Sequence, residues 1–217
     1  MSAAKPPTEP RRTGSRGRID KRQAILDAAF TVFAREGYTQ AVVDSIAAEA
    51  GVAKHTVYNH FGDKETLFRQ IIEADADRSV AKNLAAVDHL RACGTDPRPM
   101  LEEVGFRLAQ CYCEDRSMAL RRLLYAEITR FPDLLDIIRT RAMDRVNDAL
   151  ADRLARLSLA GQLTIDNPAE AAEQLTALLT GPMETRTRLG TRRVPNPEIR
   201  SVTKAAVNTF LKAFGRP

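Results

Sequence analysis

Several features are scarce or missing in this sequence of 217 residues. No stretch approaches eighteen consecutive apolar residues, although 44% of the chain is hydrophobic, so we expect neither a transmembrane helix nor a membrane partner. The first residues, MSAAKPPTEPRRTGSRGR, carry basic groups without the apolar run that a secretory signal needs. Three cysteines, an odd number, fit a reducing compartment better than a disulfide framework. We therefore expect a cytoplasmic protein.

Catalytic motifs are also missing. The sequence contains no glycine-rich phosphate loop, no HExxH motif, no GxSxG motif and no convincing pair of a histidine with a carboxylate. An enzyme would need a constellation of catalytic residues that this sequence does not show. We expect a protein that is not an enzyme and that requires no cofactor.

The cysteines allow a metal or redox interpretation, because His89 and Cys93 lie close in sequence and Cys111 and Cys113 are separated by one residue. Residues two apart on a helix point about 200° from each other, so Cys111 and Cys113 cannot share a tetrahedral metal unless the helix ends there. No CxxC motif occurs. We expect buried, unreactive thiols and no metal site, with a thiol or metal sensor as the alternative.

Hydrophobic periodicity predicts helices and no strands, and therefore an all-α fold. Asn167-Pro168 followed by Glu170 is a strong helix start, and Pro182 predicts a kink or a break in the helix that follows. The expected helices after residue 62 run from Asp63 towards Arg91, from about Pro99 through Tyr112, over about 117–130, from Pro132 to near Gly161, over 167–189 and over 197–214.

The stretch 43–62, VDSIAAEAGVAKHTVYNHFG, meets the requirements of a helix-turn-helix. Ala47 is small enough to let a second helix cross closely, and Gly51 stands at the turn, where a chain leaving a helix often needs a positive φ. Two short helices joined in this way can place the second one in the major groove of DNA. The inward-facing positions are then Ile46, Val52, Val57 and Phe61.

Segments on either side complete a small domain. Asp20–Gln23 forms a capping box and predicts the start of a first helix, and Asp63 caps a helix after the motif. An apolar stripe on the first helix ends at Gly37 and consists of Leu26, Ala29, Phe30 and Phe33.

Two segments, ILDAAFTVFAREGY and SIAAEAGVAKHTVYNHFGDKETLF, resemble the DNA-binding domain of the tetracycline-repressor (TetR) family from about Arg18 to Phe68. The run RRLLYAEITRFPDLLDIIRT at 121–140 resembles the C-terminal domain of the AefR-like subgroup. The resemblance implies an N-terminal three-helix helix-turn-helix domain followed by a larger helical ligand-binding and dimerisation domain. The expected boundaries are 1–17 for a disordered basic arm, 18–64 for the DNA-binding domain with its motif at about 42–61, and 65–217 for the helical domain.

The same resemblance implies a ligand-responsive transcriptional regulator, more specifically a repressor. A homodimer would bind double-stranded DNA at a palindromic operator and leave it when a small-molecule effector enters the C-terminal domain. By position, helices 167–189 and 197–214 would form the dimer contact. An apolar stripe such as the one through Phe210 is nevertheless more often core of its own chain than interface. The alternatives are a thiol- or metal-sensing regulator on this scaffold and an enzyme with an incidental helix-turn-helix.

The resemblance also assigns base contacts to the start of the recognition helix. Lys54, His55 and Thr56 would reach base edges, with Lys54 donating to guanine O6 or N7, and Asn59 would read a base further along. Phosphate contacts fall on Tyr58, His60 and Lys64, the last together with amides at the start of the next helix. For each residue the alternative is a solvated helix face.

One departure from the family pattern concerns the first helix of the motif. Family members usually open this helix with Thr or Ser, whereas this chain has Ala-Val-Val at 41–43. Valine has no oxygen to accept a backbone amide, and the loss of such a cap costs roughly 1 kcal/mol. The candidates to replace it are Thr39, Gln40 and Asp44.

The net positive charge is concentrated at the N-terminus. Residues 1–22 hold seven Lys or Arg and two acidic residues, whereas the other 195 residues balance 26 basic against 26 acidic groups. A segment rich in proline, glycine and arginine buries little apolar area, so it is expected to be disordered in isolation. Next to a DNA-binding domain it is expected to follow phosphates or enter the minor groove, with Arg16 and Arg18 as the best candidates. The alternative is a solvated tail.

Overall fold

The computed structural model describes the backbone of residues 13–91 and 96–216, with side chains from Asp20 onward within these ranges. The described residues form helices and no β-strand, apart from an isolated bridge between Leu163 and Gly215, which confirms the expected all-α fold. The chain folds as two compact units that divide between Ile71 and Ile72, inside one helix.

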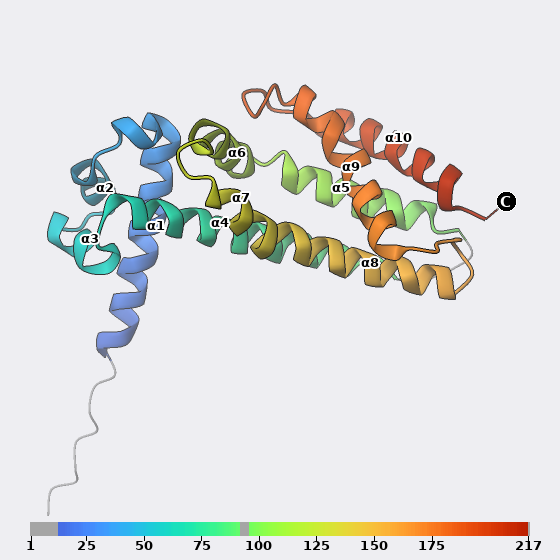
Figure 1. Cartoon of the computed structure of the whole chain (residues 1–217), viewed down its shortest axis with the longest axis horizontal. Coiled ribbons are helices and arrows are strands. Elements are labelled where there is room, and N and C mark those ends of the chain that lie inside the picture. Colours follow the sequence, from blue (N-terminus) through green and yellow to red (C-terminus); the bar gives the residue numbers. More distant parts are fainter. Residues whose placement is uncertain (1–12, 92–95, 217) are drawn as a thin grey trace, which may run out of the picture. The chain divides into compact units, whose positions relative to one another are not determined.

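The first unit contains α1 (Thr13–Gln40), α2 (Val43–Glu49), α3 (Lys54–Phe61) and the beginning of α4 (Lys64–Val87) (Figure 1). The predicted stripe of α1 is confirmed, because all four of its members are buried. Phe33 meets the ring of Phe68 edge to face at 5.2 Å, and Tyr38 lies 4.8 Å from Phe68. These rings bring the end of α1 against the start of α4, with α2 and α3 between them in sequence.

The boundaries of α1 differ in part from the sequence prediction. Gly37 interrupts the helix with a φ of 76°, as expected, but the helix begins at Thr13 instead of Asp20. A capping box marks a helix start only where the preceding residues cannot extend the helix, and no proline occurs between Pro10 and Asp20 to prevent this. Part of the expected arm, 13–17, is therefore helical, and residues 1–12 lie outside the described part of the chain.

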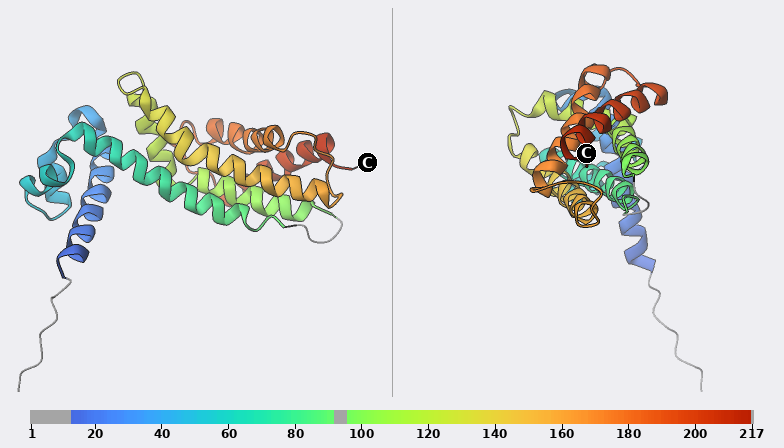
Figure 2. Two further views of the ribbon diagram at one scale, coloured as in Figure 1. Left: turned by 60° about the horizontal axis from the view of Figure 1, so that its bottom comes forward. Right: turned by 90° about the vertical axis from the view of Figure 1, so that its right-hand side faces the viewer.

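The second unit contains the remainder of α4 and all later helices. Its core brings together apolar residues of α4, α5, α8, α9 and α10, with Leu150, Leu154 and Leu175 among the buried side chains. Arg153 of α8 pairs with Asp88 at 2.8 Å, and α4 and α8 run side by side (Figure 2). The later elements are α5 (Arg98–Tyr112), α6 (Asp115–Glu127), α7 (Asp133–Ile138), a π-helical segment (Arg139–Met143), α8 (Asp144–Leu159), α9 (Pro168–Arg186) and α10 (Asn196–Phe214).

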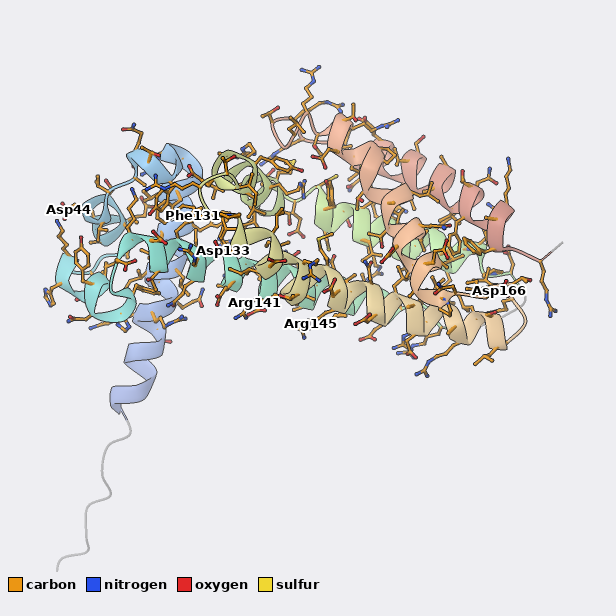
Figure 3. The ribbon with its side chains drawn as sticks, viewed as in Figure 1. Asp44, Phe131, Asp133, Arg141, Arg145 and Asp166 are labelled. Carbon is orange, nitrogen blue, oxygen red and sulfur yellow. The ribbon has the colours of Figure 1, made fainter. Side chains whose placement is uncertain are left out.

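Two sets of ion pairs hold α4 to its neighbours in the second unit. Asp75 is only 5% exposed, and Arg116 of α6 donates to both of its carboxylate oxygens, at 2.5 and 3.1 Å. A buried carboxylate is tolerated when it is paired in this way. Arg141 of the π-helical segment, labelled in Figure 3, donates to Glu73 at 3.0 Å and to Asp77 at 3.1 Å.

The helix expected from Pro132 to near Gly161 is continuous but not uniform. A π-helical turn separates α7 from α8, and a π turn shifts the register of the residues on either side of it. Leu135 of α7 and Met143 at the end of the π-helical segment are 59% and 55% exposed. Leu134 of α7 and Val146, Leu150 and Leu154 of α8 are buried.

Helix α9 has the expected start, and of the two outcomes expected at Pro182, a kink or a break, the break does not occur. The side chain of Asn167 accepts a hydrogen bond from the Glu170 amide, which confirms the predicted cap. Pro182 does not split the helix, which continues to Arg186. Leu179 and Met183, on either side of the proline, are both buried, so packing offsets the lost backbone hydrogen bond.

Helix α10 buries the apolar stripe that the sequence predicted. Ile199, Val202, Ala206 and Phe210 are buried within their own chain, with Phe210 only 1% exposed. The stripe therefore belongs to the core of the second unit, which was the alternative to a dimer contact. A dimer contact through α9 and α10 stays a prediction and would have to use other faces of these helices.

Candidate nucleic-acid interface

The turn between α2 and α3 has the backbone that the helix-turn-helix pattern predicts. Gly51 adopts a φ of 64°, which a residue without a Cβ reaches without strain. The amides of Gly51 and Val52 donate to the carbonyls of Ala48 and Ala47 at 3.2 and 3.0 Å, and so close the end of α2. The chain then starts α3 at Lys54.

The inward-facing residues of the motif anchor both short helices. Ile46 and Ala47 of α2 and Val57 and Phe61 of α3 are buried, as predicted, and Val52 is half-buried. Because these positions lie on one side of each helix, the other side of α3 is left towards solvent.

The exposed side of α3 carries the polar residues that the resemblance selected. Lys54, His55, Tyr58 and Asn59 are exposed, and Thr56 and His60 are half-buried. The first turn of α3 contains no acidic residue, and His60 lies in its last turn. Six of the nine residues expected to contact DNA thus lie on α3. Their contact with DNA stays a prediction.

Lys54 has a partner that the sequence did not indicate. Its amino group donates at 3.0 Å to Asp44 of α2, which is labelled in Figure 3, and this hydrogen bond raises the pKa of Lys54. A lysine has three N–H donors, so the pair with Asp44 leaves two for another acceptor. The sequence indicated Asp44 only as a possible helix cap. Its hydrogen bond with Lys54 depends on the angle at which α2 and α3 meet.

Lys64 is also held within the first unit. Its amino group donates to the carbonyl of Thr39 at 3.4 Å and lies 4.5 Å from the centre of the Tyr38 ring. These contacts tie the first residue of α4 to the end of α1. The sequence missed Tyr38 and Thr39 as partners of Lys64, although both lie just after Gly37, where the chain turns.

The start of α4 has the predicted cap. The amide of Thr66 donates to the Asp63 carboxylate at 2.6 Å, and this hydrogen bond lowers the pKa of Asp63. One of the amides expected to bind phosphate is therefore occupied by a carboxylate. The start of α2 differs, since Val42 forms no side-chain cap, as the Ala-Val-Val sequence implies.

Arg16 and Arg18 lie in the first turns of α1, but their side chains fall outside the described ones. Lys5, Arg11 and Arg12 lie wholly outside the described residues. The proposed role of this basic segment therefore rests on the sequence.

Two cysteines of the second unit lie within the described residues, Cys111, which is half-buried, and Cys113, which is buried. Burial raises the pKa of the Cys111 and Cys113 thiols, and the thiolate is the form that binds metals and reacts. His89 lies 3.2 Å from the guanidinium of Arg107, and Cys93 is outside the described residues. Within residues 13–91 and 96–216, no cluster of three His, Cys, Asp or Glu side chains is arranged to hold a metal ion.

Nowhere in the described part of the chain does a helix combine the length and the apolar character needed to cross a bilayer.

Comparison with protein families gives two matches that together span most of the chain. Residues 25–71 match the model of bacterial regulatory proteins of the tetR family. Residues 99–216 match the model of the AefR-like transcriptional repressor C-terminal domain. The first match contains α2 and α3, and the second begins at the start of α5.

Individual relatives are similar mainly at the N-terminus. The uncharacterized HTH-type transcriptional regulator YfiR of Bacillus subtilis is 39% identical over 71 residues, which are 32% of this chain and 35% of that protein. The HTH-type transcriptional repressor AcnR of Corynebacterium efficiens is 35% identical over 82 residues, 36% of this chain and 43% of the repressor. The matched part thus spans less than half the length of each of these curated relatives.

A solved structure extends the similarity over nearly the whole chain. It belongs to a protein of Mesorhizobium loti described as a TetR-family transcriptional regulator, with a TM-score of 0.85 and 28% sequence identity. The superposition covers 92% of this chain and 98% of that one.

Proposed function

Because the chain belongs to the TetR family of bacterial regulatory proteins, we propose that it is a homodimeric repressor of transcription that responds to a small molecule. The observation that carries this proposal is the exposed polar face of α3, held in place by the buried side of a helix-turn-helix. The repressor acts in the cytoplasm, where it meets operator DNA, and is not an enzyme.

Each protomer contributes one recognition helix, α3. Two-fold symmetry then requires a near-palindromic operator whose half-site centres lie about 34–36 Å apart, or a multiple of this distance. Lys54, His55, Thr56 and Asn59 read bases. Tyr58, His60 and Lys64 bind phosphates, which fix the position of the protein without reading sequence.

Release from the operator requires an effector that binds two arrangements of the second unit with different affinity. Helix α4 supports this mechanism, because it begins in the first unit and continues into the second. The ion pairs of Asp75 with Arg116 and of Arg141 with Glu73 link α4 to α6 and to the π-helical segment. A shift of α6 or of the π-helical segment therefore acts on α4, the helix that directly follows α3 in the chain.

A thiol or metal sensor on the same scaffold is the second candidate. The raised pKa values of Cys111 and Cys113 weigh against it, because a sensing thiol is usually a low-pKa, accessible one. Exposure of the protein to an oxidant or a chelator distinguishes the two, since only a sensor of this kind changes its DNA affinity.

Selection from random double-stranded DNA with the full-length protein tests the proposed function. We expect enrichment of a near-palindromic sequence with the half-site spacing given above. A Tyr58→Ala, His60→Ala double variant should enrich nothing, whereas Lys212→Ala, which removes a positive charge from α10, should enrich the same sequence. Failure of the wild-type protein to enrich any sequence would contradict the proposal.

A further inference from the structure

The second unit contains a cavity of about 230 Å³ between the first half of α5 and the middle of α10. Its walls come from only these two helices, so it does not depend on the position of the first unit. The lining residues are Pro99, Glu102, Glu103, Phe106, Arg200, Thr203 and Lys204.

One of the residues that line the cavity, Thr203, has an unpaired polar atom. Thr203 is 1% exposed, and its buried hydroxyl has no hydrogen-bond partner. A Cβ on Gly105 would lie 3.0 Å from the Thr203 methyl group, so glycine lets α5 and α10 approach closely at this point. A buried hydroxyl without a partner is unfavourable unless a bound molecule supplies one. This hydroxyl is thus a buried group beside the cavity that a polar atom of a ligand could satisfy.

The walls carry charges of both signs. Among the described residues, neither Glu102 of α5 nor Lys204 of α10 has an ion-pair partner, although both line the same cavity. The neighbouring acid, Glu103, pairs with Arg107 at 2.8 Å. The Arg200 guanidinium lies 3.8 Å from the centre of the Phe106 ring and keeps its charge at the cavity wall.

We propose that this cavity binds a small zwitterion, an α-amino acid with an apolar side chain. Its carboxylate lies between Lys204 and Arg200, its ammonium group meets Glu102, and its side chain packs on Phe106. A simple anion would be repelled by the acidic wall and a simple cation by the basic wall, whereas a zwitterion satisfies both. The volume is below the usual 300–1,000 Å³ of ligand pockets, which favours a ligand of this size.

Consecutive residues on a helix are about 100° apart, so a contact between copies through the exposed Ala205 of α10 would not need to cover Lys204. An effect of the bound amino acid on operator release rests on the proposed function, but its binding does not.

Isothermal titration calorimetry of the full-length protein tests the site with L-leucine, L-methionine and L-phenylalanine. We expect at least one of them to bind at millimolar concentration or below. The analogues of that amino acid lacking either the ammonium or the carboxylate should bind at least about tenfold more weakly, since each loses a charged contact. Absence of binding by all three amino acids overturns the proposal, and so does equally tight binding of either analogue.

Variants separate this site from general effects on the fold. Thr203→Val keeps the shape and removes the unpaired hydroxyl, so it should leave the melting temperature unchanged or higher and weaken binding about two- to tenfold. Glu102→Gln and Lys204→Gln should each weaken binding, and Lys212→Gln, also exposed on α10, should not. Unchanged affinity in all three cavity variants would overturn the assignment. Operator selection by the same protein distinguishes failure of this site from failure of the proposed function.

Discussion

Lys54 shows how a tertiary contact changes the meaning of a residue chosen from sequence. Its hydrogen bond to Asp44 places a carboxylate beside the side chain that is expected to read a base. Removal of the lysine alone would therefore also leave this carboxylate unpaired near DNA. The loss of the base contact can be distinguished from the repulsion between Asp44 and phosphate. Repulsion of phosphate is independent of sequence, whereas base reading is not.

We predict that Lys54→Ala relaxes base preference at one position in each half-site. In an Asp44→Asn background, which removes the competing carboxylate, the loss of discrimination should be roughly 5- to 150-fold for a bidentate contact. Competition binding against single-base operator variants measures this effect. Tyr58→Phe and His60→Ala should instead weaken binding to all sequences alike; the reverse pattern would show that the roles along α3 are wrongly assigned.

Single residues differed in how well sequence could predict them. The positive φ of Gly51 and the cap by Asp63 were predictable, because each depends on a few neighbouring residues. The pairs of Lys54 with Asp44 and of Lys64 with Thr39 were not, because they join residues 10 and 25 positions apart. Such contacts depend on the packing of separate helices.

At the scale of helices, apolar stripes were the most reliable signal. The stripes of α1 and α10 are buried as predicted, because burial of one face stabilises a helix more than propensity does. The π-helical segment was not predictable from periodicity, since nothing in the sequence marks the extra residue in its turn. The cavity between α5 and α10 also escaped prediction, because it depends on the distance between two helices.

We predict that the dimer contact uses the exposed small residues of α9 and α10. Ala177 and Ala205 are exposed in the single chain, so Ala177→Glu and Ala205→Glu should preserve the fold. Like charges brought together across a two-fold axis should raise the dimer dissociation constant at least about a hundredfold. Sedimentation velocity measures the association, and circular dichroism checks the fold.

Two controls accompany this measurement. Ala85→Glu makes the same change on an exposed position of α4 and should leave the dimer intact. Phe210→Lys should unfold the second unit, since truncating or charging a buried aromatic residue costs about 3–5 kcal/mol or more. Dimers of unchanged affinity in both glutamate variants would place the contact on other helices.

At the scale of the whole molecule, the net positive charge is concentrated in one short segment at the N-terminus. All of the net charge of +5 is accounted for by residues 1–22, whereas the remaining chain is electrically balanced. Beyond Arg22 the first unit holds four basic and six acidic residues, so the rest of this unit adds no net positive charge. Long-range attraction to DNA must then depend strongly on the N-terminal segment, at distances set by the Debye length.

We predict that removal of residues 2–12 lowers operator affinity and its salt dependence together. The deletion ends before α1 begins at Thr13, and it removes Lys5, Arg11 and Arg12 with only one acid, Glu9. If two of the three basic groups in each protomer neutralise a phosphate, a dimer loses about four such contacts. The slope of log K against log salt should then flatten by roughly 3–4, at about 0.9 for each phosphate.

Affinity should consequently fall most at low salt, and the curves of the full-length and shortened proteins should converge as salt rises. Base preference should stay nearly the same, because phosphate contacts carry no direct sequence information. A shortened protein in which Arg11 and Arg12 are retained next to Thr13 provides the control, and it should recover most of the slope. If the shortened protein shows the wild-type slope, the charge at the N-terminus belongs to a solvated tail, and attraction to DNA must come from α1, α3 and the start of α4 alone.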